Sequence, residues 1–399
     1  MVFVLSTLLL ALTATLANAQ SQNSTYVSGL IQALNNAGLT TLATAVGAVN
    51  STNVGSQLLS QLSDQSRNFT VFAPNNDAFN NVSSSITQDP NALTDIVAYH
   101  VVFGHFNNVT VYPNTTIGRT ALGDPAVVML EGNKDQVVAW AKRDDGQVHV
   151  LNQNQTNDPI VVQLASYQNL QLFIIDGVLL YPGNFSTTLQ SNSQLSGFAN
   201  FAQNTQVPVW DTSANTTENV TVIQDLSGVR GLTLFAPDDQ AFNQQIPSSI
   251  SGNTTALWAV MRNHVINGTT VYSPSFDGST YVSAAGEDFH FTSNSSGQYV
   301  TSGNTTARII QPDVLIKNGV IHIIDQVLLN TDVDQSAANS AYSSATSAAG
   351  HSSTETGPVG VPTGGSSTNK ANGAVGNVDG VSSFGVVALS AILGSFLFV

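Results

Sequence analysis

The feature that most restricts the fold is a long internal duplication. The phrase TVFAPNNDAF, at Thr70–Phe79, returns as TLFAPDDQAF at Thr233–Phe242. Two more block pairs follow in the same order, DIVAYHVVFG with WAVMRNHVING and then LFIIDGVLLYP with IHIIDQVLLN. Solenoid repeats are about 20 to 50 residues long, whereas this repeat is as long as a domain. The sequence therefore predicts two homologous domains in tandem.

Each unit combines helical and strand patterns. Residues 26–49 carry apolar residues at helical spacing, with a break at Asn-Ala-Gly. The apolar positions from Leu93 to His100 recur at i, i+3, i+4 and i+7, which predicts an amphipathic helix over 89–102. The continuous apolar run 172–180 is typical of a strand buried on both faces. Helices followed by strands indicate an α+β fold.

The repeated phrase predicts a strand-to-helix junction. Its apolar start favours a short strand, and Pro74 ends the strand because it cannot donate a ladder hydrogen bond. Asn75, like Asp238 in the second copy, is well placed to cap the following helix. The repetition of the phrase thus counts domains and does not mark a catalytic motif.

In both units the three blocks resemble the fasciclin domain of cell-surface adhesion proteins, and together they span about residues 25–330. The resemblance implies that each domain is a wedge-shaped β-sandwich with a helical layer. It also implies extracellular adhesion or matrix organisation, without a known catalytic centre. The region after the domains lacks runs of Ala-Pro or Ser-Pro, so the chain looks more like a fungal surface protein than a plant arabinogalactan protein.

The resemblance also supplies candidate adhesion contacts. In vertebrate relatives a Tyr-His motif is linked to integrin adhesion, and Tyr99-His100 matches it. Domain 2 has Asn263 before its histidine, so this role could carry over only to domain 1. The segment QPDVL resembles an Asp-Ile adhesion segment and makes Asp313 a third candidate. The residues themselves favour a core histidine at position 100, which lies on the apolar stripe, and a simple turn into a strand around Asp313.

The composition excludes several classes of binding and catalytic site. Only 9% of residues are charged, and a formal net charge of -15 with ten Lys and Arg leaves no basic patch for nucleic acid. The absence of cysteine excludes disulfides, thiolate metal sites and cysteine nucleophiles. No hydrolase, metalloprotease, dinucleotide or P-loop motif is present. We therefore expect no catalytic, cofactor-binding or metal-binding residues, although a site assembled from distant residues stays open.

Both ends of the chain read as targeting signals. Residues 1–19 form an apolar run ending in Ala-Asn-Ala, which predicts a signal peptide; a buried core helix is the alternative. Phe384–Val399 is an apolar tail preceded by a spacer and a small-residue triplet, the pattern of a glycosylphosphatidylinositol (GPI) attachment signal. The predicted attachment residue is Asn372, with Gly373 or Gly376 possible, and a transmembrane helix is the alternative reading of the tail.

The number of N-x-S/T sequons indicates a glycosylated ectodomain. Among them, Asn68 borders the strand of the repeated phrase and is the one expected to be poorly accessible. The predicted glycosylation sites are Asn23, Asn50, Asn68, Asn81, Asn108, Asn114, Asn154, Asn184, Asn215, Asn219, Asn253, Asn267, Asn294 and Asn304.

The predicted organisation has five parts. They are a signal peptide (1–19), fasciclin-like domain 1 (20–183), fasciclin-like domain 2 (184–331), a disordered Ser/Thr/Gly-rich stalk (332–372) and a GPI-attachment signal (373–399). The stalk has almost no large apolar side chains, so it cannot offset the entropy of ordering. Extended by glycans, its roughly 40 residues could lift the domains about 100 Å from the membrane.

The predicted function is adhesion or cell-wall organisation by a GPI-anchored glycoprotein on the cell surface. The expected partners are other surface or wall glycoproteins and polysaccharides, with membrane contact through the lipid only and no nucleic acid. One alternative is a wall-associated hydrolase, which needs two carboxylates about 5 to 9.5 Å apart in a cleft. Another is a passive glycosylated spacer. The sequence names no ligand and no oligomeric state.

Overall fold

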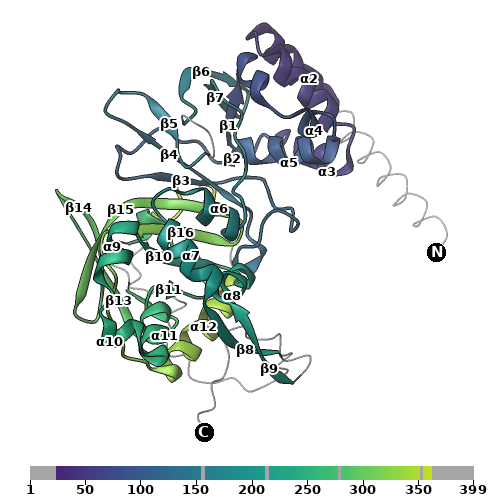
Figure 1. The fold of residues 1–399 in the computed structure, drawn as a ribbon. Helices are drawn as coiled ribbons and strands as arrows, with labels where there is room; N and C mark the ends of the chain where they lie inside the picture. Colours follow the sequence, from purple (N-terminus) through teal and green to yellow (C-terminus); the bar gives the residue numbers. More distant parts are fainter. Residues whose placement is uncertain (1–23, 154–157, 212–214, 277–279, 351–353, 362–399) are drawn as a thin grey trace, which may run out of the picture.

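The computed structural model describes residues 24–153, 158–211, 215–276, 280–350 and 354–361. It shows two tandem domains that each combine helices with strands, which confirms the α+β prediction (Figure 1). The predicted leader, the predicted attachment signal and Asn372 lie outside the described residues.

Domain 1 begins with helices that cover one end of its strands. Its helical elements are residues 24–36, α2 (Thr40–Val49), α3 (Asn53–Leu62), η1 (Asp77–Asn81), α4 (Ser84–Thr87), α5 (Pro90–His100) and η2 (Glu131–Asn133). Its strands are β1 (Phe69–Pro74), β2 (Val101–Phe103), β3 (Thr116–Arg119), β4 (Val137–Lys142), β5 (Val148–Val150), β6 (Val161–Tyr167) and β7 (Leu170–Ile175).

Domain 2 has the same plan with an added hairpin. Its helical elements are α6 (Phe185–Ser191), α7 (Ser196–Asn204), α8 (Val222–Gly228), α9 (Asp239–Gln245), α10 (Ser248–Ser251), α11 (Thr254–Arg262), η3 (Ser273–Ser275) and α12 (Gln335–Ala349). Its strands are β8 (Gln206–Asp211), β9 (Thr216–Thr221), β10 (Leu232–Pro237), β11 (Val265–Ile266), β12 (Thr280–Val282), β13 (Asp288–Asn294), β14 (Gly297–Ser302), β15 (Thr305–Ile316) and β16 (Gly319–Ile324).

The two domains share one strand arrangement. In domain 1 the sheets run β2-β1-β7-β6 and β3-β4-β5, and in domain 2 one sheet runs β11-β10-β16-β15-β14-β13-β12. The pairs β1–β7 and β10–β16 are parallel, and the other pairs are antiparallel. Ala121 N–H donates to Val101 O at 2.8 Å, and Ala284 N–H donates to Val265 O at 2.7 Å. These bonds join the two ends of the strand series in each domain and fix which residues correspond between domains.

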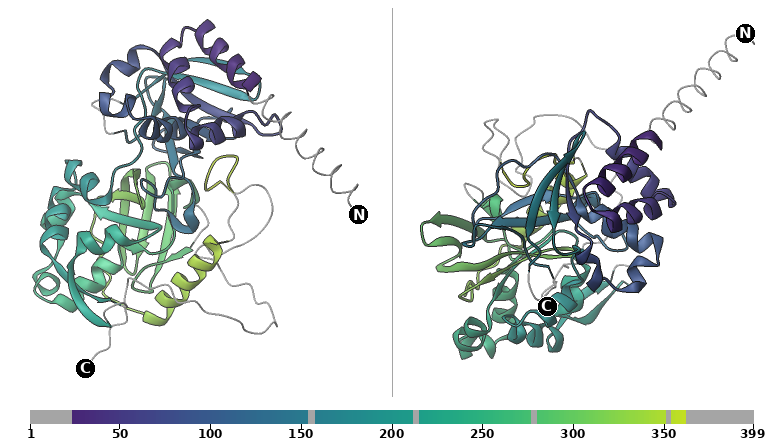
Figure 2. Two further views of the ribbon diagram at one scale, coloured as in Figure 1. Left: turned by 90° about the vertical axis from the view of Figure 1, so that its right-hand side faces the viewer. Right: turned by 90° about the horizontal axis from the view of Figure 1, so that it is seen from above.

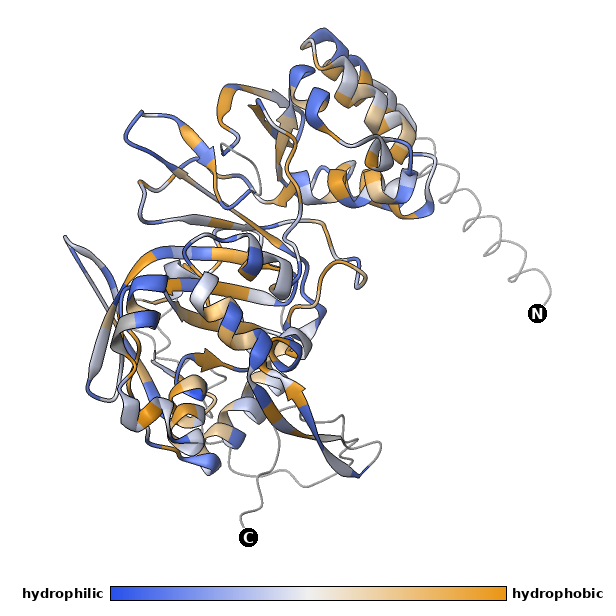
Figure 3. Cartoon of the chain, viewed as in Figure 1, coloured by the Kyte–Doolittle hydropathy of each residue, from blue (hydrophilic) through white to orange (hydrophobic). Residues whose placement is uncertain are grey.

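The repeated phrase forms the predicted junction in both domains. Pro74 and Pro237 are the last residues of β1 and β10. The side chain of Asn75 accepts the N–H of Ala78, and Asp238 caps α9 by accepting the N–H of Ala241. Both strands lie between two others, and hydrophobic residues run along these central strands (Figure 3). The phrase is therefore a structural element of the core.

A buried asparagine in each domain holds the loop that leads into the central strand. The Asn169 side chain donates to three carbonyl oxygens between Leu62 and Arg67. The Asn318 side chain donates to Leu226 O at 2.9 Å and Val229 O at 2.8 Å, and this residue is 2% exposed. The sequence motifs did not include either residue, although each directly precedes the last strand of its sheet core, β7 or β16.

The predicted stalk does not begin as a disordered segment. Residues 335–349 form α12, which Asp334 caps by accepting the N–H of Ala337. Ala345 and Ala349 are buried, and Tyr342 lies against Gly268. The prediction of disorder from residue 332 is therefore wrong for this first part, because its small side chains pack closely against domain 2. Residues 362–372 lie outside the described part.

We expect Asn318→Ala to destabilise the protein by about 2–3 kcal/mol, because two buried carbonyl oxygens lose the hydrogen bonds that the Asn318 amide donates. The free energy of unfolding in urea measures this effect. Asn35→Ala, at an exposed helix position, is the matched control and should change stability by less than about 0.5 kcal/mol. Equal effects of the two substitutions would contradict the clamping role of Asn318.

Candidate functional site

The candidate histidines are core residues whose two ring nitrogens are both bonded. In domain 1, His100 Nδ1 donates to Ile96 O at 2.7 Å, and its Nε2 accepts the Leu179 N–H at 2.9 Å. His264 makes the same pair of bonds in domain 2, at 2.7 and 3.0 Å. Burial lowers the pKa of each histidine to about 4, against a smaller opposite effect of the backbone bond. Both rings are therefore neutral supports between a helix and the chain after the last strand.

None of the three candidate adhesion residues is at the surface. Tyr99 and Asp313 are fully buried and His100 is 4% exposed. A partner cannot reach these side chains while the chain is folded, so the adhesion role suggested for them does not hold in this structure. Burial raises the pKa of the Tyr99 phenol. The structure gives Asp313 a different role.

Asp313 anchors the seam between the two domains. Its carboxylate accepts bonds from the Thr115 hydroxyl of domain 1 at 2.5 Å and from the N–H and hydroxyl of Ser273 of domain 2 at 2.8 and 2.5 Å. Its own N–H donates to His322 Nδ1 at 3.2 Å, and its carbonyl accepts from the Asn152 amide of domain 1. The backbone has φ 57° here, a left-handed conformation that is uncommon for a non-glycine residue. Dense hydrogen bonding offsets the cost of a buried charge.

Around Asp313 the seam contains a buried apolar cluster. One buried cluster joins strands of both domains and the end of the described chain: Ile117, Val137, Ala139, Ala141, Leu151, Tyr272, Leu315, Val320 and Val359. The loop between β3 and β4 reaches across it, since Met129 N–H donates to Lys317 O at 2.8 Å and Glu131 accepts from the Thr270 hydroxyl at 2.7 Å. The two domains therefore share one buried core.

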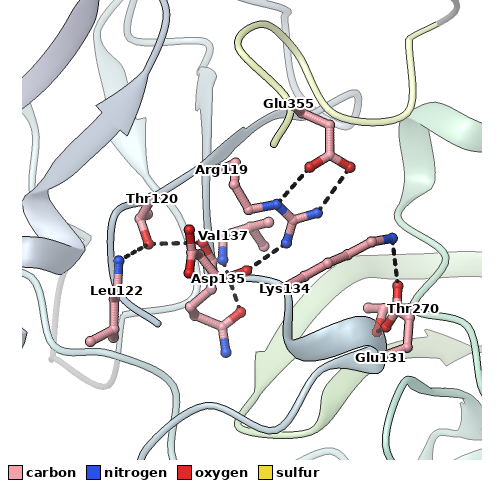
Figure 4. Close-up of polar contacts among 10 residues, drawn as sticks. Arg119, Thr120, Leu122, Glu131, Lys134, Asp135, Val137, Thr270 and Glu355 are labelled. Atoms are coloured by element: carbon pink, nitrogen blue, oxygen red, sulfur yellow. Dashed lines mark hydrogen bonds and ion pairs between the residues drawn. The ribbon is translucent and has the colours of Figure 1, made fainter. Parts of the chain in front are cut away.

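Residues 354–361, which we call the strap, lie where the two domains meet (Figure 2). Val359 N–H donates to Ile117 O at 2.8 Å. Glu355 pairs with Arg119 through two bonds, Nε to Oε2 at 2.9 Å and Nη2 to Oε1 at 3.2 Å (Figure 4). The strap thus connects the end of domain 2 back to β3 of domain 1.

The charges at the strap depend on one another. Arg119 is only 3% exposed, and its remaining nitrogen donates to Asp135 O at 2.7 Å. Burial alone would raise the pKa of the Glu355 carboxyl, but the Arg119 charge and hydrogen bonds hold that pKa below its usual value. The strap also needs Gly104, where an added Cβ would lie 2.1 Å from Thr356 O. The sequence analysis did not identify Arg119 or Glu355. Each is an isolated charged residue, Arg119 in a β-rich stretch and Glu355 in a Ser/Thr-rich segment, and this isolation was the signal that could have identified them.

The predicted glycosylation sites that the structure describes are almost all on the surface. Asn23 and Asn154 lie outside the described residues, and every other sequon except Asn267 is exposed. Asn68, expected to be poorly accessible, is exposed. Asn267 is half-buried beside α12, which makes it the least accessible of the sequons in the described part. This distribution is compatible with glycans on both domains and leaves occupancy a prediction.

Among the described residues, no group of three His, Cys, Asp or Glu side chains is placed to hold a metal ion. In the same residues, no helix has the length and apolar character needed to cross a membrane. Three carboxylates, Asp95, Asp124 and Asp135, do line one groove of domain 1. Domain 1 therefore has a groove with more than one carboxylate, as the hydrolase alternative requires.

Comparison with known proteins identifies the domains. The fasciclin domain model matches residues 29–181 and 208–330. A "Fasciclin-like arabinogalactan protein" of Arthroderma benhamiae is 26% identical over 276 residues, covering 66% of this chain and 59% of that protein. "Fasciclin-like arabinogalactan protein elcF" of Phaeosphaeria nodorum is 22% identical, covering 67% of this chain and 80% of that protein.

The similarity extends beyond fungi. Human "Periostin" is 23% identical over 272 residues, covering 67% of this chain but only 29% of periostin. A solved FAS1 domain pair from the insect cell adhesion molecule fasciclin I covers 71% of this chain and 96% of that structure, at 17% identity and a TM-score of 0.31. This chain thus spans about three fifths of the Arthroderma protein and under a third of periostin.

We expect His100→Gln to lower the free energy of unfolding more at neutral pH than at acidic pH. Between pH 6.5 and 4 the unfolded chain binds a proton that the buried ring does not, so wild-type stability falls by about 1.4 kcal/mol per pH unit from this group. Glutamine does not titrate, so the variant does not lose stability in this way as the pH falls. In urea unfolding, the variant should be about 2 kcal/mol less stable at pH 7.5 and nearly equal to wild type at pH 5. An unchanged difference at the two pH values would show that the ring does not stay neutral.

We expect Glu355→Gln to release the strap, because it leaves the buried Arg119 without its counter-charge. Elastase cleavage within residues 354–361 should become at least several-fold faster than in wild type. Glu218→Gln, at an exposed position, removes the same charge and should leave the rate unchanged. In wild type, the pair stabilises the strap above pH 4.5, the ordinary pKa of the carboxyl, and is lost as pH falls through the lower folded value. Equal cleavage of both variants would contradict the role of the pair.

Proposed function

Because the chain belongs to the fasciclin domain family, we propose that it is a cell-surface adhesion glycoprotein whose two domains act as one rigid binding unit. The family match in two segments is the observation that carries the proposal. The fasciclin family and these relatives are adhesion-type rather than enzymatic proteins, which favours binding over hydrolysis. We further propose that a signal peptide directs the chain outside the cell and that a GPI lipid holds it there.

The shared core supports a rigid unit. A contact surface that spans both domains keeps its shape only if the domains cannot rotate against each other, and interdomain motion is the default unless the interface is large and hydrophobic. Here an apolar cluster and the bonded carboxylate of Asp313 fill the seam. A partner that touches both domains would then meet a surface already in its binding conformation, which lowers the entropy cost of binding.

The packed strap shortens the proposed spacer. The spacer after the described body then consists of residues 362–372, the last of which is the proposed attachment residue. Eleven residues reach at most about 40 Å, so the domains would stand much nearer the membrane than the 100 Å expected for a stalk that starts at residue 332. Such a short spacer favours contacts close to the cell surface or within the wall.

Enzymatic release from cells tests the anchor and adhesion together. Cells displaying the protein are treated with phosphatidylinositol-specific phospholipase C, and both the released protein and cell aggregation are measured. We expect release and a loss of aggregation. Protein that stays on the membrane would contradict the GPI anchor, and full release without any change in aggregation would contradict adhesion.

A matched control separates the two claims. In it, residues 373–399 are replaced by a transmembrane segment, so that the same domains resist the phospholipase. These cells should keep aggregating after treatment. Removal of N-glycans from them tests the passive-spacer alternative, since aggregation that disappears while the fold is intact would assign the contact to the glycans.

A further inference from the structure

The two domains differ at one equivalent place, a groove between the His-bearing helix and the end of the strand that follows it. Counting from the paired residues His100 and His264, Ala98 corresponds to Arg262 and Phe103 to Asn267. Ala121 corresponds to Ala284 through their matching backbone bonds. These residues line a groove in each domain, so the grooves can be compared side by side.

In domain 2 the chain itself fills this groove. The segment from Asn330 onward turns along α11, and α12 lies over Ala284 and Asn267. Asp334 N–H donates to Ala285 O at 2.8 Å, and a Cβ added at Gly286 would lie 1.8 Å from Asp334 O. The docked segment is therefore in close backbone contact with the groove.

A cation of the groove wall completes this packing. The Arg262 guanidinium donates to Ala284 O and to the side chain of Gln335, at the start of α12, at 3.0 Å to the latter. The wall of the groove thus supplies the positive charge, and the docked helix supplies a neutral acceptor.

In domain 1 the equivalent groove is open. Its volume is about 460 Å³. The chain leaves the last strand in another direction, toward domain 2, where Lys317 N–H donates to Gly183 O at 2.8 Å. Alanine at position 98 takes the place of the arginine, and Val54 at the groove edge is 63% exposed. Among the described residues, none that follows β7 lines this groove, whereas α12, which follows β16, lies over the equivalent groove of domain 2.

The charge of the open groove is also reversed. Asp95, Asp124 and Asp135 line it, and its lining among the described residues contains no Lys, Arg or His. Burial raises the pKa of Asp95 to about 6, and the negative charges of Asp124 and Asp89 add to this shift. Burial likewise raises the pKa of Asp135 although Arg119 acts in the opposite direction. These carboxylates would gain from a nearby cation, and domain 1 places its own Arg119 with Glu355.

We propose that the groove of domain 1 is a docking site for a short helical segment of a partner protein that carries an arginine or lysine. The partner helix takes the place that α12 has in domain 2. The charges are exchanged between wall and helix: in domain 2 the wall supplies the cation Arg262, whereas in domain 1 the wall supplies carboxylates and the partner helix supplies the cation. A second copy's α12 is a poor occupant, because it is already docked in its own domain 2 and residues 335–349 contain no basic side chain. The net charge of -15 would favour the approach of a basic partner.

This inference deepens the proposed adhesion role and rests on it, but its test uses purified protein without cells. Two fluorescent peptides serve as probes, residues 334–349 with the natural sequence and the same peptide with Gln335→Arg. Fluorescence anisotropy at low salt measures their affinity for the purified chain. In the part of the chain that the structure describes, α12 fills the groove of domain 2, and the groove of domain 1 is free to take the peptide.

We expect the Gln335→Arg peptide to bind at least tenfold more tightly than the natural peptide. Asp95→Asn and Asp124→Asn should each weaken its binding by roughly tenfold, the usual scale for a charge-assisted hydrogen bond. Asp144→Asn, at an exposed position away from the groove lining, removes the same charge and should leave the affinity unchanged. Thermal unfolding of each variant verifies that the fold is intact.

Equal affinity of the two peptides would overturn the proposal, as would equal effects of the groove and control substitutions. A β-1,3-glucan hexasaccharide tests the glycan reading, and binding of the sugar without binding of the basic peptide would assign the groove to a polysaccharide. If the peptide binds as expected while aggregation of intact cells does not depend on the protein, only the adhesion role falls.

Discussion

The buried carboxylate of Asp313 is the interaction on which the two-domain arrangement depends. A charge out of water is tolerated only where hydrogen bonds replace its hydration, and here the donors come from both domains, Thr115 on one side and Ser273 on the other. Moving the domains apart would remove one donor and admit water to the apolar cluster around it. The seam thus resembles the interior of a single domain more than a contact between two.

The sequence predicted what is local and repeated. The junction after Pro74, its capping by Asn75 and the helix that ends at His100 follow from residues within one turn of each other. The seam could not be predicted in this way, because Thr115 and Asp313 are 198 positions apart in the chain. Asp313 was noticed for its resemblance to an adhesion segment, and only its burial shows that it serves the seam.

The segment after domain 2 shows where a composition argument fails. Its alanines and serines suggested disorder because they bury little apolar area. In the structure the same small side chains permit close approach, as at Gly132, where an added Cβ would lie 2.3 Å from Ala349 O. One ion pair, Arg119 with Glu355, then fixes the following strap on domain 1. A low-complexity segment is disordered only if no surface of the protein is complementary to it. Here the surfaces of the two domains are complementary to α12 and the strap.

Divergence between the two copies explains how a duplicated fold can acquire separate tasks. Domain 2 covers its own groove with α12, which Arg262 of the groove wall contacts, while domain 1 uses its β3–β4 loop to reach its neighbour and, among the described residues, leaves its groove open. One copy thereby contributes mainly to the rigid body, and the other retains a free surface. Both depend on the seam that holds them in one orientation.

Calorimetric unfolding of the purified chain tests most directly the claim that the two domains share one core. If the domains share one core, heating should give a single transition whose calorimetric enthalpy equals the van't Hoff enthalpy. A Thr115→Val and Asp313→Asn double variant should split it into two transitions. Two separate transitions in the wild-type protein would show that the domains unfold independently and would contradict the account.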